Sequence, residues 1–142
     1  MEKKNIVKKL LESGLKKTKY RVSIIDLLAH SEQLLSAQDI YDILKKKKIN
    51  VNLSTVYRTL DKLTESHIIN RVDIEKEKQT LYEFNREEHH HFLICKECNK
   101  IETIYHCPLH DYEEELMKAS GFIITSHKIE FYGLCKECQK HA

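Results

Sequence analysis

The residues whose spacing points most directly to chemistry are four cysteines in two matched pairs. Cys95 and Cys98 form one C-x-x-C pair, and Cys135 and Cys138 form a second near the end of the chain. Two such pairs supply four thiolates, which suit a tetrahedral zinc ion bound for structural reasons and leave it no open position for catalysis. Thioredoxin-like redox chemistry is the alternative, but two matched pairs fit zinc better. We therefore expect a structural zinc site.

A run of three histidines, His89–His91, directly precedes the first cysteine pair. Once the thiolates are assigned to zinc, these imidazoles remain available for a second metal ion. Imidazole and carboxylate ligands bind zinc, iron or manganese reversibly, whereas an all-thiolate site favours zinc and retains it. An open histidine site would also fit a zinc-dependent hydrolase, but the sequence lacks the H-E-x-x-H signature. We expect a regulatory metal site and no enzyme.

The chain contains no apolar run long enough to span a membrane, and no secretory hydrophobic core follows its first residues. A cytoplasmic protein without a membrane partner is therefore expected. In that reducing compartment, paired cysteines bind metal more often than they form disulfides.

Charge divides the chain into two parts. Residues 1–84 carry 17 Lys and Arg against 12 Asp and Glu, whereas residues 85–142 carry 7 against 10. A basic part followed by an acidic part indicates one module for a polyanion and a second module with another task. We therefore expect domains over 1–84 and 85–142.

Helices followed by a hairpin are expected in the first domain. Helical spacing predicts a helix over 6–13, a second ending near His30, a third beginning at Ser36 with a capping box, and a fourth capped by Ser54. The expected buried faces are Tyr20, Ile24, Leu27 and Leu28 in the second helix and Val56, Leu60 and Leu63 in the fourth. Alternating stretches at 70–74 and 80–84 around a charged 75–79 predict a β-hairpin.

This combination of elements predicts a winged helix whose fourth helix enters the major groove of double-stranded DNA. Its outward-facing side chains could contact a guanine edge, a thymine methyl group and phosphates. A plain helical core with a polar face is the alternative, and the hairpin favours DNA. The expected DNA contacts are Ser54, Thr55, Tyr57 and Arg58.

The second domain is expected to have the order β-β-α-β, with strands over 92–94, 100–104 and 122–132 and a helix over 108–120. The side chains expected on buried faces are Leu109, Tyr112, Leu116, Ile123, His127, Ile129 and Phe131. A domain of under 60 residues buries little core alone, so a structural zinc and a partner subunit are both expected. The predicted class is α+β, a winged-helix DNA-binding domain followed by a small α/β dimerisation domain with a four-cysteine zinc site.

The whole chain resembles the ferric uptake regulator family of metal-dependent bacterial repressors. Five segments carry the resemblance: Gly14–Arg21, Ser36–Tyr41, Ser54–Leu60, the histidine run with Cys95-x-x-Cys98, and His127–Cys138. Cys107-Pro108 makes the chain most similar to the zinc uptake regulator branch. The resemblance implies a homodimer on AT-rich palindromic operators, with Tyr57 and Arg58 reading DNA and Lys16 reaching the minor groove.

The resemblance also implies regulatory ligands. A site at the hinge between domains would use Glu83, His89 and His91, with Glu102 as a further ligand, and a second would use Glu88 or His90 with His110 and His127. The family's histidine from the DNA-binding domain is missing, because Leu34 occupies its place, and His30 is a substitute only if the loop bends back. One extra residue before Cys95 can exchange the histidines between sites, since side chains alternate on a strand. Cys107 is expected to be a buried structural thiol, with a redox or metal role as the minority interpretation.

The predicted function is a repressor of metal-uptake genes that binds DNA when its regulatory site is filled. Zinc is the expected signal. A peroxide or iron sensor of the same family, in which an iron-bound histidine is oxidised, is the alternative. Ligand softness sets only a preference and cellular availability decides occupancy, so both remain open.

Overall fold

The computed structural model describes residues 2–74 and 78–141 of the 142-residue chain. The chain divides into two compact units, Met1–Arg86 and Glu87–Ala142. Helices and sheets occur in both, which confirms the α+β class. None of the described helices combines the length and the apolar character that a membrane span requires.

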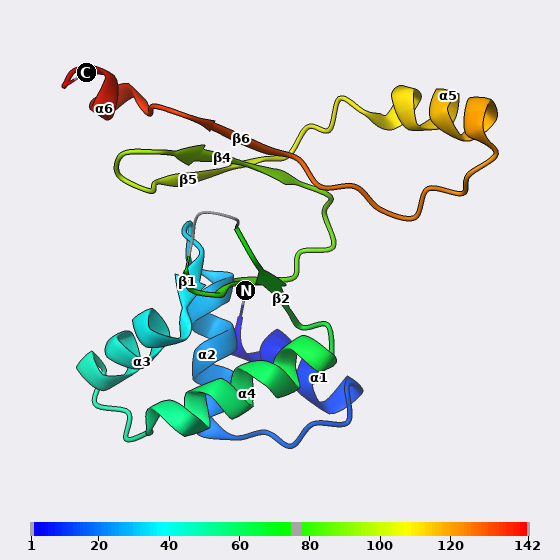
Figure 1. The fold of residues 1–142 in the computed structure, drawn as a ribbon. Helices are drawn as coiled ribbons and strands as arrows, with labels where there is room; N and C mark the ends of the chain where they lie inside the picture. The colour runs from blue at the N-terminus through cyan, green and yellow to red at the C-terminus, as the bar shows by residue number, and fades with distance from the viewer. Residues whose placement is uncertain (1, 75–77, 142) are drawn as a thin grey trace. The chain divides into compact units, whose positions relative to one another are not determined.

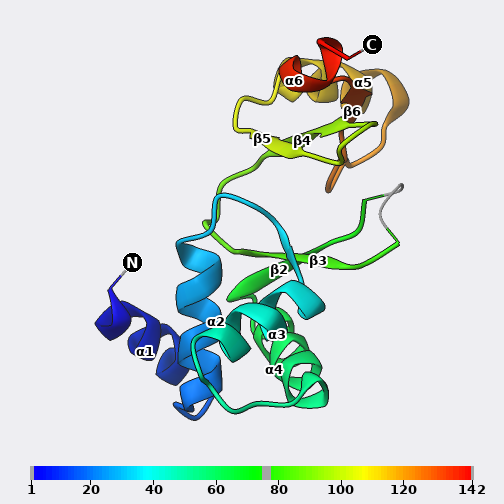
Figure 2. The ribbon, with the colours of Figure 1, turned by 90° about the vertical axis from the view of Figure 1, so that its left-hand side faces the viewer.

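The first unit packs helices against a small antiparallel sheet with strand order β1-β3-β2 (Figure 1). Its elements are α1 (Lys3–Glu12), α2 (Lys19–Ala29), β1 (Leu35–Ser36), α3 (Ala37–Lys46), α4 (Leu53–Glu65), β2 (Ile69–Val72) and β3 (Leu81–Phe84). The predicted hairpin is confirmed in β2 and β3, although residues 75–77 of its charged turn lie outside the described residues. Figure 2 shows this hairpin following the helices, the arrangement of a winged helix.

Side-chain caps fix where α3 and α4 begin. The backbone N–H of Asp39 donates to Ser36 Oγ at 3.1 Å, and the N–H of Ser36 donates to Asp39 Oδ2 at 2.9 Å, so the predicted capping box is confirmed. The prediction that Ser54 caps α4 is wrong, because Asn52 Oδ1 accepts the N–H of Thr55 at 2.8 Å. Ser54 therefore lies in the first turn of α4.

The core of the first unit lies among its helices and the sheet. The predicted stripe of α4, Val56, Leu60 and Leu63, is fully buried. The predicted face of α2 is partly wrong, because Ile25 is buried where Tyr20 and Leu27 are only half-buried. This face turns toward Ile25 because α2 packs against α1, α3, α4 and β3 at once.

The second unit is built around one three-stranded sheet with strand order β5-β4-β6. Its elements are β4 (His91–Cys95), β5 (Ile101–Ile104), α5 (His110–Ser120), β6 (Glu130–Gly133) and α6 (Lys136–Gln139). The predicted order β-β-α-β is confirmed. Strand β4 pairs antiparallel with β5 and parallel with β6, and α5 lies in the crossover that a parallel pair requires.

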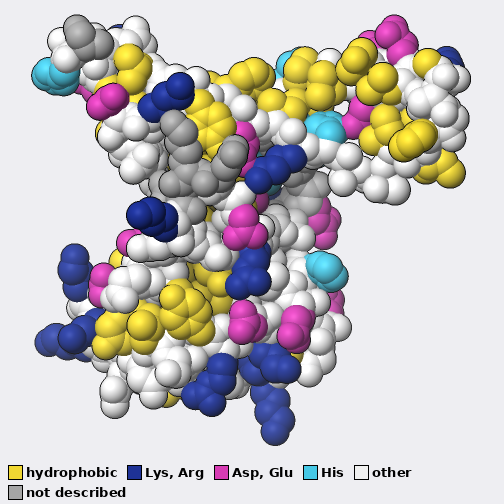
Figure 3. All heavy atoms as spheres, viewed as in Figure 1, with side chains coloured by type: hydrophobic (Ala, Val, Ile, Leu, Met, Phe, Trp, Pro, Cys, Tyr) yellow, Lys and Arg dark blue, Asp and Glu magenta, His cyan; other side chains and the backbone are white. Residues whose placement is uncertain are grey.

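Two predictions of burial and strand length in the second unit are wrong. The strand expected over 122–132 is confined to Glu130–Gly133, and Ile123, expected on its buried face, is 86% exposed. The helix begins after Pro108 rather than at it, and none of its described residues is buried, including Tyr112 and Leu116. In Figure 3, hydrophobic side chains gather on the surface of this unit. The apolar side chains whose spacing predicted burial are therefore exposed to solvent in the single chain.

Candidate metal centres

The four paired cysteines form one cluster at one end of the second sheet. Cys95 ends β4 and Cys98 follows in the turn to β5, while Cys135 precedes α6 and Cys138 lies within it. Their Sγ atoms all lie within 4.8 Å of one another. The Sγ atoms of Cys98 and Cys135 are 3.8 Å apart, which matches the separation of about 3.8 Å that tetrahedral Zn–S bonds of about 2.3 Å require. The donor set therefore fits a structural zinc ion.

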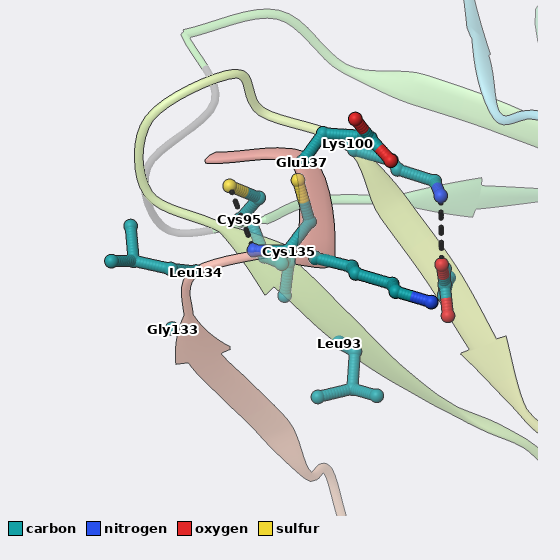
Figure 4. Close-up of a pocket in the computed structure, with 10 residues that line it drawn as sticks. Leu93, Cys95, Lys100, Gly133, Leu134, Cys135 and Glu137 are labelled. Carbon is teal, nitrogen blue, oxygen red and sulfur yellow. Dashed lines mark hydrogen bonds and ion pairs between the residues drawn. The ribbon is translucent and has the colours of Figure 1, made fainter. Parts of the chain in front are cut away.

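Hydrogen bonds and burial shift the pKa values of two thiols in this cluster in opposite directions. The backbone N–H of Cys135 donates to Cys95 Sγ at 3.3 Å (Figure 4), and this hydrogen bond chiefly lowers the pKa of the Cys95 thiol to about 6. The pKa of the Cys138 thiol is raised to about 12, chiefly by the hydrogen bond between the Cys138 and Cys135 side chains and next by burial. A divalent cation bound between the four sulfurs would supply the charge that stabilises all of them as thiolates.

A second cluster gathers His89, His91, Cys107 and His127, whose ligand atoms all lie within 4.8 Å of one another. His127 Nε2 lies 2.8 Å from His89 Nε2 and 3.0 Å from His91 Nε2. Cys107 Sγ lies 3.3 Å from His91 Nε2 and 3.2 Å from His127 Nε2. Tetrahedral Zn–N bonds of about 2.1 Å would place nitrogen ligands about 3.4 Å apart. The four donors are therefore close to the spacing of a metal site.

Alternate histidines of the run enter this second cluster. His91 is the first residue of β4, and His89 lies two residues before it, in the segment that leads into the strand. Their ring centroids are 4.5 Å apart. His90 lies between them and turns elsewhere, with Nδ1 2.8 Å from the Glu88 carbonyl oxygen and its ring against Phe92. The run therefore contributes two imidazoles to the cluster.

The surroundings of His127 and His91 suit metal binding. Nδ1–H of His127 donates to the carboxylate of Glu113 on α5, which leaves Nε2 with its lone pair toward the other donors. His91 is 3% exposed, and burial, then the neighbouring His89 and His127, lower its pKa. Neutral imidazole is the form that binds metal. A cavity lined by His89, Cys107, Glu113 and His127 opens at this cluster and gives a cation access.

Other residues predicted as ligands in this unit lie outside both clusters. Glu102 on β5 forms an ion pair with Lys100 at 2.9 Å, which raises the pKa of the lysine. His110 is exposed and lies 3.8 Å from Glu114. The backbone oxygen of Glu88 lies 2.8 Å from His90 Nδ1. The sequence divided His89, His91 and His127 between two sites, whereas the structure brings them into one group.

Cys107 lies in this second cluster, although the sequence favoured a buried structural thiol over a metal or redox role. It is half-buried between the histidines rather than enclosed in an apolar core. No local spacing rule links it to them, because it lies 16 residues from His91 and 20 from His127. The signals in the sequence were the odd cysteine count and the resemblance of Cys107-Pro108 to the zinc uptake regulator branch.

Two further candidates belong to the first unit. Glu83 is half-buried on β3, where Asn70 Nδ2 donates to it at 3.3 Å. His30 is the C-cap of α2, with Nδ1 2.8 Å from the carbonyl oxygen of Asp26. Leu34 is half-buried. A metal-binding role for Glu83 or His30 stays a prediction.

The outer face of α4 carries the residues predicted to contact DNA. Tyr57 is 48% exposed, and Arg58 and Ser54 are also exposed. Arg58 Nη2 lies 3.5 Å from Thr55 Oγ1 in the preceding turn. Lys16 is exposed between α1 and α2, and lysine and arginine side chains stand along this unit in Figure 3. The buried stripe of α4 faces the core, so these side chains remain available to a partner.

Comparisons with known proteins give a consistent result. Residues 12–132 match the Ferric uptake regulator family. The chain is 32% identical over 140 residues to the ferric uptake regulation protein of Neisseria meningitidis serogroup A, a match that covers 98% of this chain and 96% of that protein. It is 31% identical over 139 residues to the peroxide operon regulator of Bacillus subtilis, covering 98% and 94%. The solved structure of Fur from Helicobacter pylori, with three functional metal binding sites, has a TM-score of 0.84 at 28% identity, covering 98% and 95%.

The names of these relatives refer to ferric uptake and to a peroxide operon, so the expected membership in the zinc uptake regulator branch has support only from the sequence. The family match nevertheless spans both units. This chain belongs to the ferric uptake regulator family of metal-binding, DNA-binding transcription regulators, and it is not an enzyme.

Proposed function

We propose that this chain is a metal-dependent transcriptional repressor that binds its operator when His89, His91 and His127 hold a regulatory metal ion. The observation that carries the proposal is the convergence of three Nε2 atoms within 4.8 Å, with the shared ring of His127 oriented by Glu113. Imidazole rings in this arrangement bind a divalent cation reversibly, as a sensor requires.

Metal binding would act on the second unit through the segments that carry the ligands. His91 is the first residue of β4 and His89 lies two residues before it, whereas His127 lies in the irregular segment 121–129 before β6. A shared cation would hold this segment against β4 and select one arrangement of the unit. Repression then follows as a population shift toward a DNA-competent state.

The active species would be a homodimer in the cytoplasm. Apolar side chains of the second unit are exposed, including Leu93 at 45% and Phe131 at 51%. We propose that this apolar surface packs against the same surface of a second subunit, because small domains with exposed apolar faces commonly dimerise. Each partner would contribute one winged helix to an AT-rich palindrome, with α4 in the major groove and Lys16 beside the minor groove.

The metal that acts as signal has two candidates. Iron, with peroxide sensing through an oxidised histidine as its variant, is supported by the names of the relatives. Zinc is supported by the donor set, since Cys107 adds a thiolate to the three imidazoles. Glu83 stays a predicted additional ligand.

Paired variants in the histidine run test the proposal. His89→Ala with His91→Ala should leave the structural zinc and the oligomeric state unchanged but abolish metal-dependent binding to a duplex selected from a random-sequence pool. His90→Ala is the matched control, because its ring turns away from the cluster. DNA binding is followed by fluorescence anisotropy with and without added Fe²⁺, Zn²⁺ or Mn²⁺. Metal-dependent binding by the double variant would contradict the proposal.

A further inference from the structure

Cys107 lies against the three histidines, although the chain's other cysteines form a separate cluster. Its Sγ atom is 3.3 Å from His91 Nε2 and 3.2 Å from His127 Nε2. Its side chain also lines the cavity that opens at the histidines. The structural cluster already has its four sulfurs in Cys95, Cys98, Cys135 and Cys138. The position of Cys107 therefore associates its thiol with the regulatory site.

Three imidazoles alone would leave one position of a tetrahedral metal ion open. Among the described residues, the group of close donors consists of the three histidines and Cys107. It contains no carboxylate, so the Cys107 sulfur is its fourth donor. Glu113 contacts Nδ1 of His127, on the far side of that ring, so its role is to orient the ring. A thiolate at Cys107 would close the coordination sphere.

The type of the fourth ligand determines which cation binds best. A soft thiolate favours zinc, whereas manganese prefers hard oxygen ligands in an octahedral site. A sphere of three imidazoles and one thiolate also has the four-ligand geometry of zinc. The thiolate adds one negative charge directly beside the ion, where it contributes most to binding.

We propose that Cys107 is the fourth ligand of the regulatory site and the residue that sets its preference for zinc over manganese. This inference rests on the proposed function, in which the three histidines bind the regulatory metal. Cys107 would provide the selectivity between cations, and the histidines would provide most of the affinity for metal. A site with Cys107 removed would still bind metal, but it would discriminate poorly between the two cations.

Cobalt titration of the full-length protein tests this assignment directly. The protein is purified with its structural zinc retained and its regulatory site emptied by mild chelation, and zinc is counted to show one ion per subunit throughout. Added Co²⁺ should then produce a thiolate-to-cobalt charge-transfer band in the near ultraviolet. Cys107→Ser and Cys107→Asp should lose this band and keep the weaker d–d bands of bound cobalt. His110→Ala is the matched control, because His110 lines the same cavity outside the donor group.

Competition between cations gives the second measurement. Cys107→Ser should lower the affinity for Zn²⁺ by at least roughly 10-fold, because loss of a residue that only supports a ligand already costs that much. The affinity for Mn²⁺ should change little. Cys107→Asp should shift the preference toward Mn²⁺. Cobalt binding without a charge-transfer band, or an equal loss of both cations in Cys107→Ser, would overturn the inference.

An alkylation assay on the wild-type protein gives an answer even where a variant fails to fold. Cys107 should react with iodoacetamide when the regulatory site is empty and be protected when it is filled with zinc. Equal reactivity in both states would also overturn the inference. The proposed function fails separately, if the double histidine variant retains metal-dependent DNA binding. The two failures are therefore distinguishable.

Discussion

Glu113 on α5 accepts a hydrogen bond from Nδ1 of His127, and this contact directs the opposite nitrogen of the ring toward His91. A carboxylate behind a metal-binding imidazole fixes its tautomer and increases its basicity. Glu113 thus links the helix of the second unit to its regulatory site.

Glu113→Ala should weaken binding of the regulatory metal by about 10- to 100-fold, because the tautomer and orientation of His127 are no longer fixed. Isothermal titration with Zn²⁺, on protein that keeps its structural zinc, measures this loss. Glu114→Ala is the matched control, since Glu114 lies on the same helix beside the exposed His110. Equal affinities in the two variants would show that Glu113 does not position the ligand.

Cys95→Ser should remove the tightly held zinc and unfold the second unit. The change removes the sulfur that accepts the N–H of Cys135 and opens the four-sulfur sphere. Zinc analysis after gel filtration and circular dichroism measure the two effects. Cys107→Ser, the matched loss of a cysteine outside this cluster, should keep its zinc. A folded Cys95→Ser protein with a full zinc equivalent would contradict the structural role.

Arg58→Ala should lower affinity for the operator by roughly 1–3 kcal/mol and relax sequence preference at one position, as expected for loss of a base contact. Lys16→Ala should instead weaken binding to all sequences more evenly. Lys8→Ala removes an exposed charge from α1 and serves as the control. Anisotropy titrations over a range of salt concentrations separate these effects. Unchanged operator binding by Arg58→Ala would remove α4 from the recognition hypothesis.

Phe131→Glu should convert the proposed dimer into a monomer. Phe131 on β6 is paired with Leu93 on β4, and both side chains are exposed on the sheet. A charge placed there would have to lose its hydration on association. Leu11→Glu is the control, because Leu11 is 62% exposed on the first unit. Sedimentation equilibrium distinguishes the species, and a Phe131→Glu dimer as stable as wild type would place the interface elsewhere.

Features encoded by local spacing could be predicted from the sequence. The two C-x-x-C pairs indicate their common cluster, because two residues between cysteines allow both sulfurs to reach one ion. Ser36 and Asp39 likewise specify their capping box within four residues. The start of α4 could not be fixed in the same way, since Asn52 and Ser54 are both good N-caps and only the folded backbone selects Asn52.

Features that depend on distant parts of the chain could not be predicted. His89 and His127 are 38 residues apart, and their contact depends on how the irregular segment before β6 folds back. The alternation of apolar residues over 122–132 predicted a long strand, but only its last residues pair with β4. Cys107 joins the histidines through the same long-range folding. Sequence therefore indicated which residue types bind metal more reliably than which of them share a site.

The most direct test of the two-site account is metal content per subunit, measured before and after mild chelation, together with binding to the selected AT-rich duplex. We expect one zinc that resists the chelator and a second, labile equivalent whose removal abolishes DNA binding and whose return restores it. DNA binding that persists after the labile metal is removed would contradict the regulatory site. Loss of all metal from a protein that stays folded and dimeric would contradict the structural one.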